Sequence, residues 1–166
     1  MNSAVTLVDF DRLLNGLDHI YSEFSRACGL SDCACWMLVD TSTAGGSIAV
    51  SRLTSEWFYS KQTINSAIKT LTARDFATLE FAEGSRKNKV VRLTEAGMRF
   101  AERYALPALK AEQRAFGALE PCEQREIMRL IGKFSHALGD ECDAFKQHIA
   151  AESQAENQGE GESCDS

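Results

Sequence analysis

A change of hydrophobic period in the middle of the chain constrains the fold more than any other feature. Between Ser60 and Leu71 apolar residues recur at the spacing of one helix face. After Asp75 the period becomes two, in two short segments centred near Leu79 and Val91, and a polar turn with a glycine joins them. The sequence therefore predicts a helix followed directly by a β-hairpin.

The helix that begins at Ser60 also has a second face, which is polar and contains no acidic residue. It consists of Gln62, Asn65, Ser66 and Lys69. A helix with one apolar and one uncharged-polar face can pack on its own domain and still offer amides and hydroxyls to base edges in DNA. The alternative is a face that is simply solvated, as most polar helix faces are.

The hairpin carries positive charge at and beside its tip, on Arg86, Lys87 and Lys89. The chain of 166 residues has a net charge of −6, but the segment from Arg52 to Arg92 holds eight basic and four acidic residues. That segment is therefore +4, and the rest of the chain is −10. This asymmetry favours a nucleic-acid partner. The alternative is a charged turn that only keeps an exposed hairpin in solution.

Three helices are predicted before this segment. The first runs from Asp9 to Cys28, where Gly29 follows as a stop signal. Ser31 suits the N-cap of a second helix that continues to about Asp40, and a third covers about 51–58. Together with the helix from Ser60, they complete a helix-turn-helix arrangement.

Two long helices are predicted after the hairpin. One covers 95–117, is capped by Thr94 and should be kinked at Pro107. The other begins near Pro121 and carries an apolar stripe from Ile127 to Ile149. Residues 151–166 contain five acids, no base and no large apolar residue, so this segment is expected to form a disordered acidic tail. An unburied stripe of that length indicates dimerisation, because soluble monomers avoid such patches.

The fold class that follows is mainly α with a small β wing, a winged helix-turn-helix with long N- and C-terminal dimerisation helices. Double-stranded DNA is the expected partner. Gln62 and Asn65 suit bidentate contacts to adenine, Thr63 can offer its methyl group to thymine, and Ser60 and Lys61 suit phosphate contacts. The complete predicted DNA-binding set is Ser60, Lys61, Gln62, Thr63, Asn65, Ser66, Lys69, Arg86, Lys87 and Lys89.

Two motifs resemble those of MarR-type transcriptional regulators over about residues 8–150. The segment 59–63, Tyr-Ser-Lys-Gln-Thr, is similar to the start of their recognition helix, and 91–97, Val-Arg-Leu-Thr-Glu-Ala-Gly, is similar to the junction after their wing. The resemblance implies a DNA-binding winged helix at 47–94 and a homodimer formed through 9–28 and 95–150.

The sequence also departs from the family pattern. The family's wing usually has an Asp and an Arg two residues apart, where this chain has Ser85 and Lys87. The loss of the Asp removes a carboxylate that would orient the wing cation. Trp57 and Phe58 replace smaller residues before the turn.

The resemblance further implies a small-molecule effector that shifts the DNA-binding geometry. Candidate residues for such a ligand pocket are aromatic, namely Tyr21, Phe24, Trp36, Trp57 and Tyr104. The alternative is that these aromatic side chains are ordinary core residues.

Other chemistry has little support in the sequence. No glycine-rich phosphate loop, metal-ligand set or nucleophile in a recognisable setting is present, so we expect no catalytic residues, no cofactor and no metal. The first residues show no signal peptide, and no apolar run reaches the length of a membrane span, so we expect no membrane partner and a cytoplasmic location. The six cysteines are Cys28, Cys33, Cys35, Cys122, Cys142 and Cys164.

The leading hypothesis is thus a sequence-specific, ligand-responsive repressor that binds pseudo-palindromic DNA as a homodimer. Two alternatives remain open. One is a winged-helix module that binds protein and has no specific DNA affinity, which the overall acidity would suit. The other is a regulator whose signal is the oxidation of a cysteine thiol.

Overall fold

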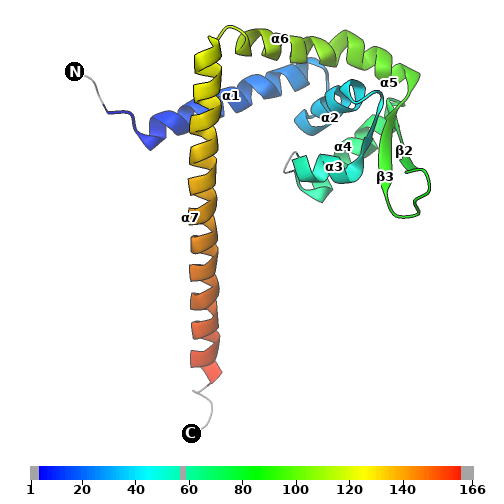
Figure 1. The fold of residues 1–166 in the computed structure, drawn as a ribbon. Helices are drawn as coiled ribbons and strands as arrows, with labels where there is room; N and C mark the ends of the chain where they lie inside the picture. Colours follow the sequence, from blue (N-terminus) through cyan, green and yellow to red (C-terminus); the bar gives the residue numbers. More distant parts are fainter. Residues whose placement is uncertain (1–3, 57–58, 162–166) are drawn as a thin grey trace. The chain divides into compact units, whose positions relative to one another are not determined.

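The computed structural model of the chain describes residues 4–56 and 59–161. It divides into two units, residues 1–114 and 115–166. The first unit holds three strands and the helices around them, and the second is dominated by one long helix (Figure 1). The expected class, mainly helical with a small β wing, is confirmed.

The first two helices begin where local capping chemistry places them. Helix α1 (Leu7–Ala27) starts after Thr6, which forms a reciprocal capping box with Asp9. Helix α2 (Asp32–Thr43) starts after Ser31, whose hydroxyl accepts the amide of Ala34 at 3.4 Å. The predicted cap at Ser31 is confirmed. Helix α2 is the central element of the core, since eight of its twelve residues are buried.

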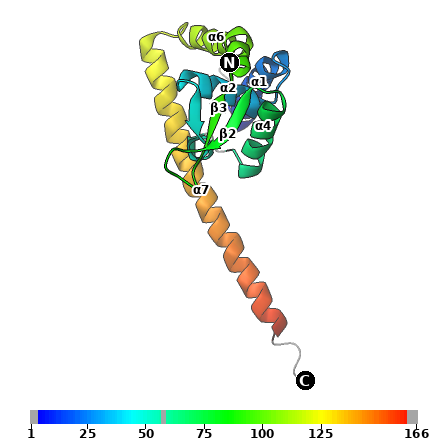
Figure 2. The same cartoon turned by 90° about the vertical axis from the view of Figure 1, so that its right-hand side faces the viewer.

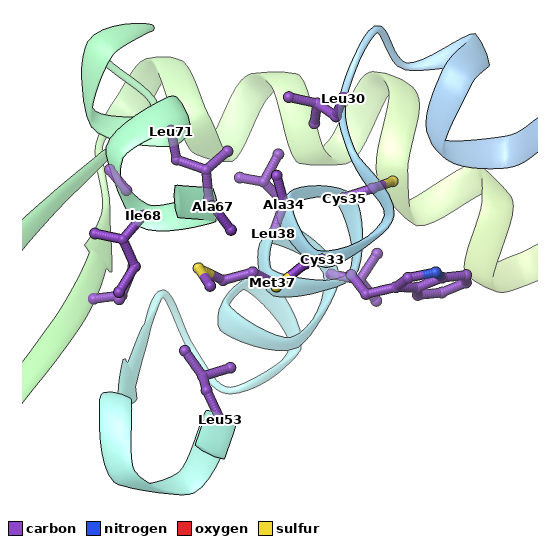
Figure 3. Packing of buried hydrophobic residues seen from close by; sticks show 14 of the residues in the cluster. Leu30, Cys33, Ala34, Cys35, Met37, Leu38, Leu53, Ala67, Ile68 and Leu71 are labelled. Carbon is purple, nitrogen blue, oxygen red and sulfur yellow. The ribbon is translucent and has the colours of Figure 1, made fainter. Parts of the chain in front are cut away.

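The helix-turn-helix consists of α3 (Val50–Glu56) and α4 (Lys61–Ala73). Figure 3 shows the apolar stripe of α4 directed toward α2, with Ala67, Ile68 and Leu71 near Met37 and Leu38. This packing fixes the rotation of α4 about its axis. The polar face of α4 is therefore turned away from the core.

The sheet has three antiparallel strands in the order β1-β3-β2, made of β1 (Ser47–Ala49), β2 (Ala77–Phe81) and β3 (Lys89–Leu93). Strands β2 and β3 form the predicted hairpin, seen beside α4 in Figure 2. Sequence analysis missed β1, because three residues are too few to show a period.

The helix predicted at 95–117 is interrupted. It consists of α5 (Glu95–Phe100), a π-helical segment η1 (Ala101–Ala105) and α6 (Leu106–Phe116). Pro107 accounts for the interruption, since its ring would clash with the carbonyl of Arg103 in a regular α-helix. A wider π turn directly before the proline removes that conflict without ending the helix.

A close approach joins the hairpin to α5. The hydroxyl of Thr94 donates to the carbonyl of Asp75 at 2.6 Å and accepts the amide of Gly97 at 3.0 Å. A Cβ atom on Gly97 would collide with the carbonyl group of Phe76. Glycine is thus required at this position, which gives a physical reason for the Thr-x-x-Gly pattern after the wing.

The second unit contains α7 (Pro121–Gly161), a helix of 41 residues. Its apolar side chains, including Leu130 and Leu138, are exposed in the single chain. The helix continues past Ala151, so the structure differs up to Gly161 from the disordered tail predicted for 151–166. Alanine, glutamate and glutamine are good helix formers, and that segment contains no proline. Within the described parts of the chain, none of the helices joins sufficient length to sufficient apolar character for a membrane span.

Candidate nucleic-acid interface

Helix α4 separates its two faces as the sequence predicted. Its buried apolar residues, which include Ile64 and Leu71, are at most 5% exposed. All of the residues of α4 that were predicted to contact DNA are exposed, namely Lys61, Gln62, Thr63, Asn65, Ser66 and Lys69. No acidic residue lies within the helix. This surface can accept a phosphate backbone and present amide groups to base edges.

The hydroxyl of Ser60 caps the N-terminus of α4 and is therefore already hydrogen-bonded within the chain. The hydroxyl of Ser60 accepts the amide of Thr63 at 3.0 Å, and the two hydroxyl oxygens lie 2.8 Å apart. Ser60 therefore fixes where the helix begins. The amides of Lys61 and Gln62 in the first turn remain available to an anion, which the helix dipole also favours.

The loop of the wing is ordered by a serine. The hydroxyl of Ser85 accepts the amides of Lys87 at 3.2 Å and Asn88 at 2.9 Å. The backbone closes the loop further, because the amide of Ala82 donates to the carbonyl of Asn88 at 2.8 Å. The sequence suggested that loss of the family's Asp leaves the wing cation unoriented. The structure instead shows a hydroxyl that fixes the backbone on which Lys87 is carried.

The positive charges of the winged helix differ in whether a carboxylate pairs with them. Arg52 and Arg92 are paired with Glu56 at 2.9 Å and Glu80 at 3.2 Å. Within the described chain, by contrast, no ion pair is formed by the cations on α4 and at the wing tip, which are Lys61, Lys69, Arg86 and Lys87. Within the winged helix, most cations without an ion pair therefore lie on the two elements that the sequence assigned to DNA.

Two further basic side chains have other contacts. The Nζ atom of Lys89 lies 5.7 Å from the centroid of the Phe81 ring, beside the exposed outer half of the hairpin. Arg74 donates to the carbonyl of Gly29 at 2.9 Å and lies over the ring of Phe76. Lys89 stays at the predicted interface, whereas Arg74 joins the end of α4 to the turn before α2.

The predicted pocket residues are divided between two hollows. Tyr21 and Trp36 line a cleft of about 420 Å³. Phe24 and Tyr104 line a second, shallower hollow of about 270 Å³. Trp57 lies outside the described residues.

The larger cleft also contains residues that sequence reasoning did not assign to it. These are Tyr59, which directly precedes the cap of α4, and Asp18, Ser22, Asp32 and Glu112. The hydroxyl of Tyr21 donates to Glu112 at 2.6 Å across 91 positions of sequence. This hydrogen bond, followed by burial, raises the pKa of Tyr21 to about 12.

The cysteines of α2 are poorly suited to rapid oxidation. Burial raises the pKa of the Cys33 thiol to about 11 and that of Cys35 to about 12, and thiolate is the reactive form. Cys28 is half-buried, and its Sγ donates to the carbonyl of Tyr104 at 3.5 Å. Among the described residues no group of His, Cys, Asp and Glu could hold a metal ion.

Comparison with known proteins shows which solved structures share this fold. No protein-family model and no curated protein sequence matches the chain. Many solved structures do match. A MarR family regulator from Neisseria meningitidis has a TM-score of 0.71 at 16% identity, covering 84% of this chain and 98% of its own.

Two further structural neighbours were solved with bound molecules. A MarR family transcriptional regulator from Listeria monocytogenes, complexed with a 26mer DNA, has a TM-score of 0.63 at 19% identity and covers 84% of this chain and 92% of its own. The PcaV transcriptional regulator from Streptomyces coelicolor, in complex with its natural ligand, has a TM-score of 0.62 at 17% identity. The match covers 81% of this chain and 98% of the regulator. The chain therefore has the MarR-type winged-helix fold that its motifs predicted.

Proposed function

We propose, from this fold and its charge distribution, that the chain is a transcription regulator that binds specific DNA sequences and catalyses no reaction. The observation that carries the proposal is that α4 and the wing tip expose amides and cations without an ion pair, on a segment that is positive within a chain that is acidic overall. The DNA complex of the Listeria neighbour supports the same use of this fold.

In this proposal the winged helix at 47–94 contacts DNA. Helix α4 enters the major groove, where Gln62 and Asn65 contact base edges and Thr63 offers its methyl group. Lys61 and the first-turn amides contact the phosphate backbone. Arg86, Lys87 and Lys89 on the wing contact the neighbouring backbone or minor groove.

We propose a homodimer as the binding species. The apolar side chains on α1 and α7 have no cover in the single chain: Leu13 is 70% exposed, Leu17 51% and Leu130 49%. Soluble proteins rarely leave such patches open, and a second copy would bury them. A two-fold dimer also matches the two half-sites of a pseudo-palindromic operator. We infer that repression is the role and that a small molecule in the first unit modulates it, as the ligand complex of the Streptomyces neighbour suggests.

The test is a titration of the purified protein with DNA flanking its own gene, in parallel with scrambled DNA of equal composition, at several salt concentrations. We expect the native fragment to bind at least about 1,000-fold more tightly than the scrambled one, as specific protein–DNA complexes generally do. Equal, weak binding to both fragments would favour the protein-interaction module instead.

A further inference from the structure

The cleft of about 420 Å³ in the first unit is lined mainly by aromatic and acidic side chains. Three of its residues are aromatic, Tyr21, Trp36 and Tyr59, and three others carry carboxylates, Asp18, Asp32 and Glu112. No basic side chain is among the described lining residues. The volume falls within the range of small-molecule sites, which is about 300–1,000 Å³.

The aromatic walls come from three separate elements. Tyr21 lies on α1 and Trp36 on α2, and their rings pack edge to face with centroids 5.6 Å apart. Tyr59 stands directly before the cap of α4. Aromatic rings attract cations through their negatively charged faces, most strongly where water is excluded. Trp36 is only 8% exposed, so water is largely excluded from the inner wall of the cleft.

The carboxylates are not neutralised by the protein. The second oxygen of Asp32 accepts the hydroxyl of Ser22 at 2.8 Å, and one oxygen of Glu112 accepts Tyr21 at 2.6 Å. Both donors are neutral groups. None of the ion pairs in the described chain includes Asp18, Asp32 or Glu112. The N-terminus of α2 offsets the charge of Asp32 in part, because that residue lies in its first turn.

The negative potential is also visible in a neighbouring group. Burial raises the pKa of Tyr59, and the charges of Cys33, Asp32 and Asp18 raise it further. An anionic ligand would add to this repulsion, whereas a cation would relieve it. A metal ion is a poor occupant, since among the described residues no set of acidic or sulfur ligands is gathered closely enough to hold one.

We propose that this cleft binds a small organic cation, a protonated or quaternary amine with an apolar body, and that the cation is the effector of the regulator. The amine lies between Asp18 and Glu112, and the apolar body lies against Trp36 and Tyr59. The part of the proposal that concerns regulation rests on the proposed function; the binding itself does not.

The position of Tyr59 couples the cleft to DNA binding. Tyr59 is followed by Ser60, whose hydroxyl caps α4, and α2 packs against α4 through the core. An occupant in contact with Tyr59 and Trp36 therefore touches both the start of the DNA-contacting helix and the helix behind it. Binding that favours one arrangement of these elements changes the fraction of protein that can bind DNA.

The test uses three probes with one body and different charge: phenethylammonium, 2-phenylethanol and phenylacetate. Isothermal titration of the full chain without DNA, at matched ionic strength, measures each affinity. We expect phenethylammonium to bind at least about tenfold more tightly than 2-phenylethanol and phenylacetate to bind least, because a desolvated cation–π contact and two carboxylates favour the cation alone. Equal affinity for the three probes, a preference for phenylacetate, or no binding up to 10 mM, a limit of roughly 3 kcal/mol of binding free energy, would each overturn the proposal.

Variants locate the site. Asp18→Asn and Glu112→Gln should each weaken phenethylammonium binding roughly five- to tenfold and leave 2-phenylethanol unchanged. Asp18 is exposed and Glu112 is partly buried, so solvent screens the attraction of these carboxylates but does not remove it. Asp11→Asn, on α1 and outside the cleft, is the matched control and should behave as the unmutated protein. Thermal melting verifies that each variant folds. If both cleft variants bind phenethylammonium normally, the cation lies elsewhere and the proposed site is wrong.

A separate titration with DNA tests the regulatory part. At saturation, phenethylammonium should change the affinity of the unmutated protein for the specific fragment at least threefold, and Glu112→Gln should need roughly five- to tenfold more amine for the same change. Amine binding with unchanged DNA affinity would overturn the effector role and leave the site intact. If the unmutated protein shows no specific DNA binding even without the amine, the proposed function is refuted instead.

Discussion

Helices α4 and α7 carry apolar residues at the same helical spacing, yet the structure treats them differently. On α4 the stripe is buried, with Leu71 at 0% exposure and Ile64 at 1%. On α7 the stripe is open, with Leu130 at 49% and Ile131 at 47%. Periodicity therefore predicts a helix and the direction of its apolar face, but not which molecule covers that face. For α4 the cover is α2 of the same chain, and for α7 we propose a second copy.

The difference can be tested first at the buried stripe. Leu71→Ala should lower the free energy of unfolding by about 3–5 kcal/mol, because a fully buried leucine leaves a cavity that the surrounding core cannot fill. Chemical denaturation measures this loss, which should be the same at every protein concentration. A loss that shrinks as the concentration rises would mean that α4 is also covered by a partner chain.

A substitution in the exposed stripe of α7 should instead affect the association of two chains. Leu130→Asp should dissociate the dimer and weaken DNA binding about 100-fold or more, because the second half-site contact is no longer intramolecular. Sedimentation and DNA titration measure the two effects. Gln147→Asp, on the polar side of α7, is the matched control and should change neither. A monodisperse monomer of the unmutated protein at micromolar concentration would refute the dimer.

The polar face of α4 provides a smaller effect. Gln62→Ala or Asn65→Ala should cost about 1–3 kcal/mol of DNA binding and relax the preference at one position of each half-site. Binding to a set of operators with single base changes measures this. Gln113→Ala, an exposed position on α6, serves as the control. If either variant loses affinity equally for all sequences, its side chain contacts backbone rather than bases.

The parts of the fold that were predictable depend on neighbouring residues. Ser31 and Thr94 cap helices as expected, since a cap needs only a hydroxyl and the next three amides. Ser60, which was expected to begin its helix and to contact phosphate, is also a cap. Strand β1 was missed because its order comes from pairing with β3, more than 40 positions away. The π-helical turn before Pro107 was foreseen only as a kink.

The candidate sites show the same division. The exposed cations of α4 and the wing follow from charge and period within 30 consecutive residues. The cleft does not, because it joins Asp18, Tyr59 and Glu112 from three distant segments. Sequence could suggest Tyr21 and Trp36 as lining only because they are large and aromatic. It gave no sign that carboxylates would stand beside them, and the proposed charge of the ligand depends on those carboxylates.

The smallest predicted effect concerns the wing, where the sequence departs from the MarR-type pattern that its motifs otherwise resemble. Lys87 has no ion-pair partner in the described chain, and its backbone is fixed by Ser85. If its ammonium group meets a phosphate, binding releases condensed counterions, and log affinity falls with log salt by roughly 0.9 for each phosphate neutralised. Lys87→Ala should therefore weaken binding nearly uniformly across sequences and reduce the salt slope by about 1 per protomer.

Lys110→Ala, on α6, removes an equal charge away from the winged helix and is the matched control. It should leave the slope unchanged, because a charge that contacts no phosphate displaces no condensed counterion. Ser85→Ala distinguishes the effect of the Lys87 charge from the effect of an ordered wing loop. It keeps Lys87 but removes the hydroxyl that accepts the amides of Lys87 and Asn88. Affinity should then fall with the slope retained. An unaltered slope in Lys87→Ala alongside intact specific binding would show that the wing points away from DNA and that α4 carries the recognition alone.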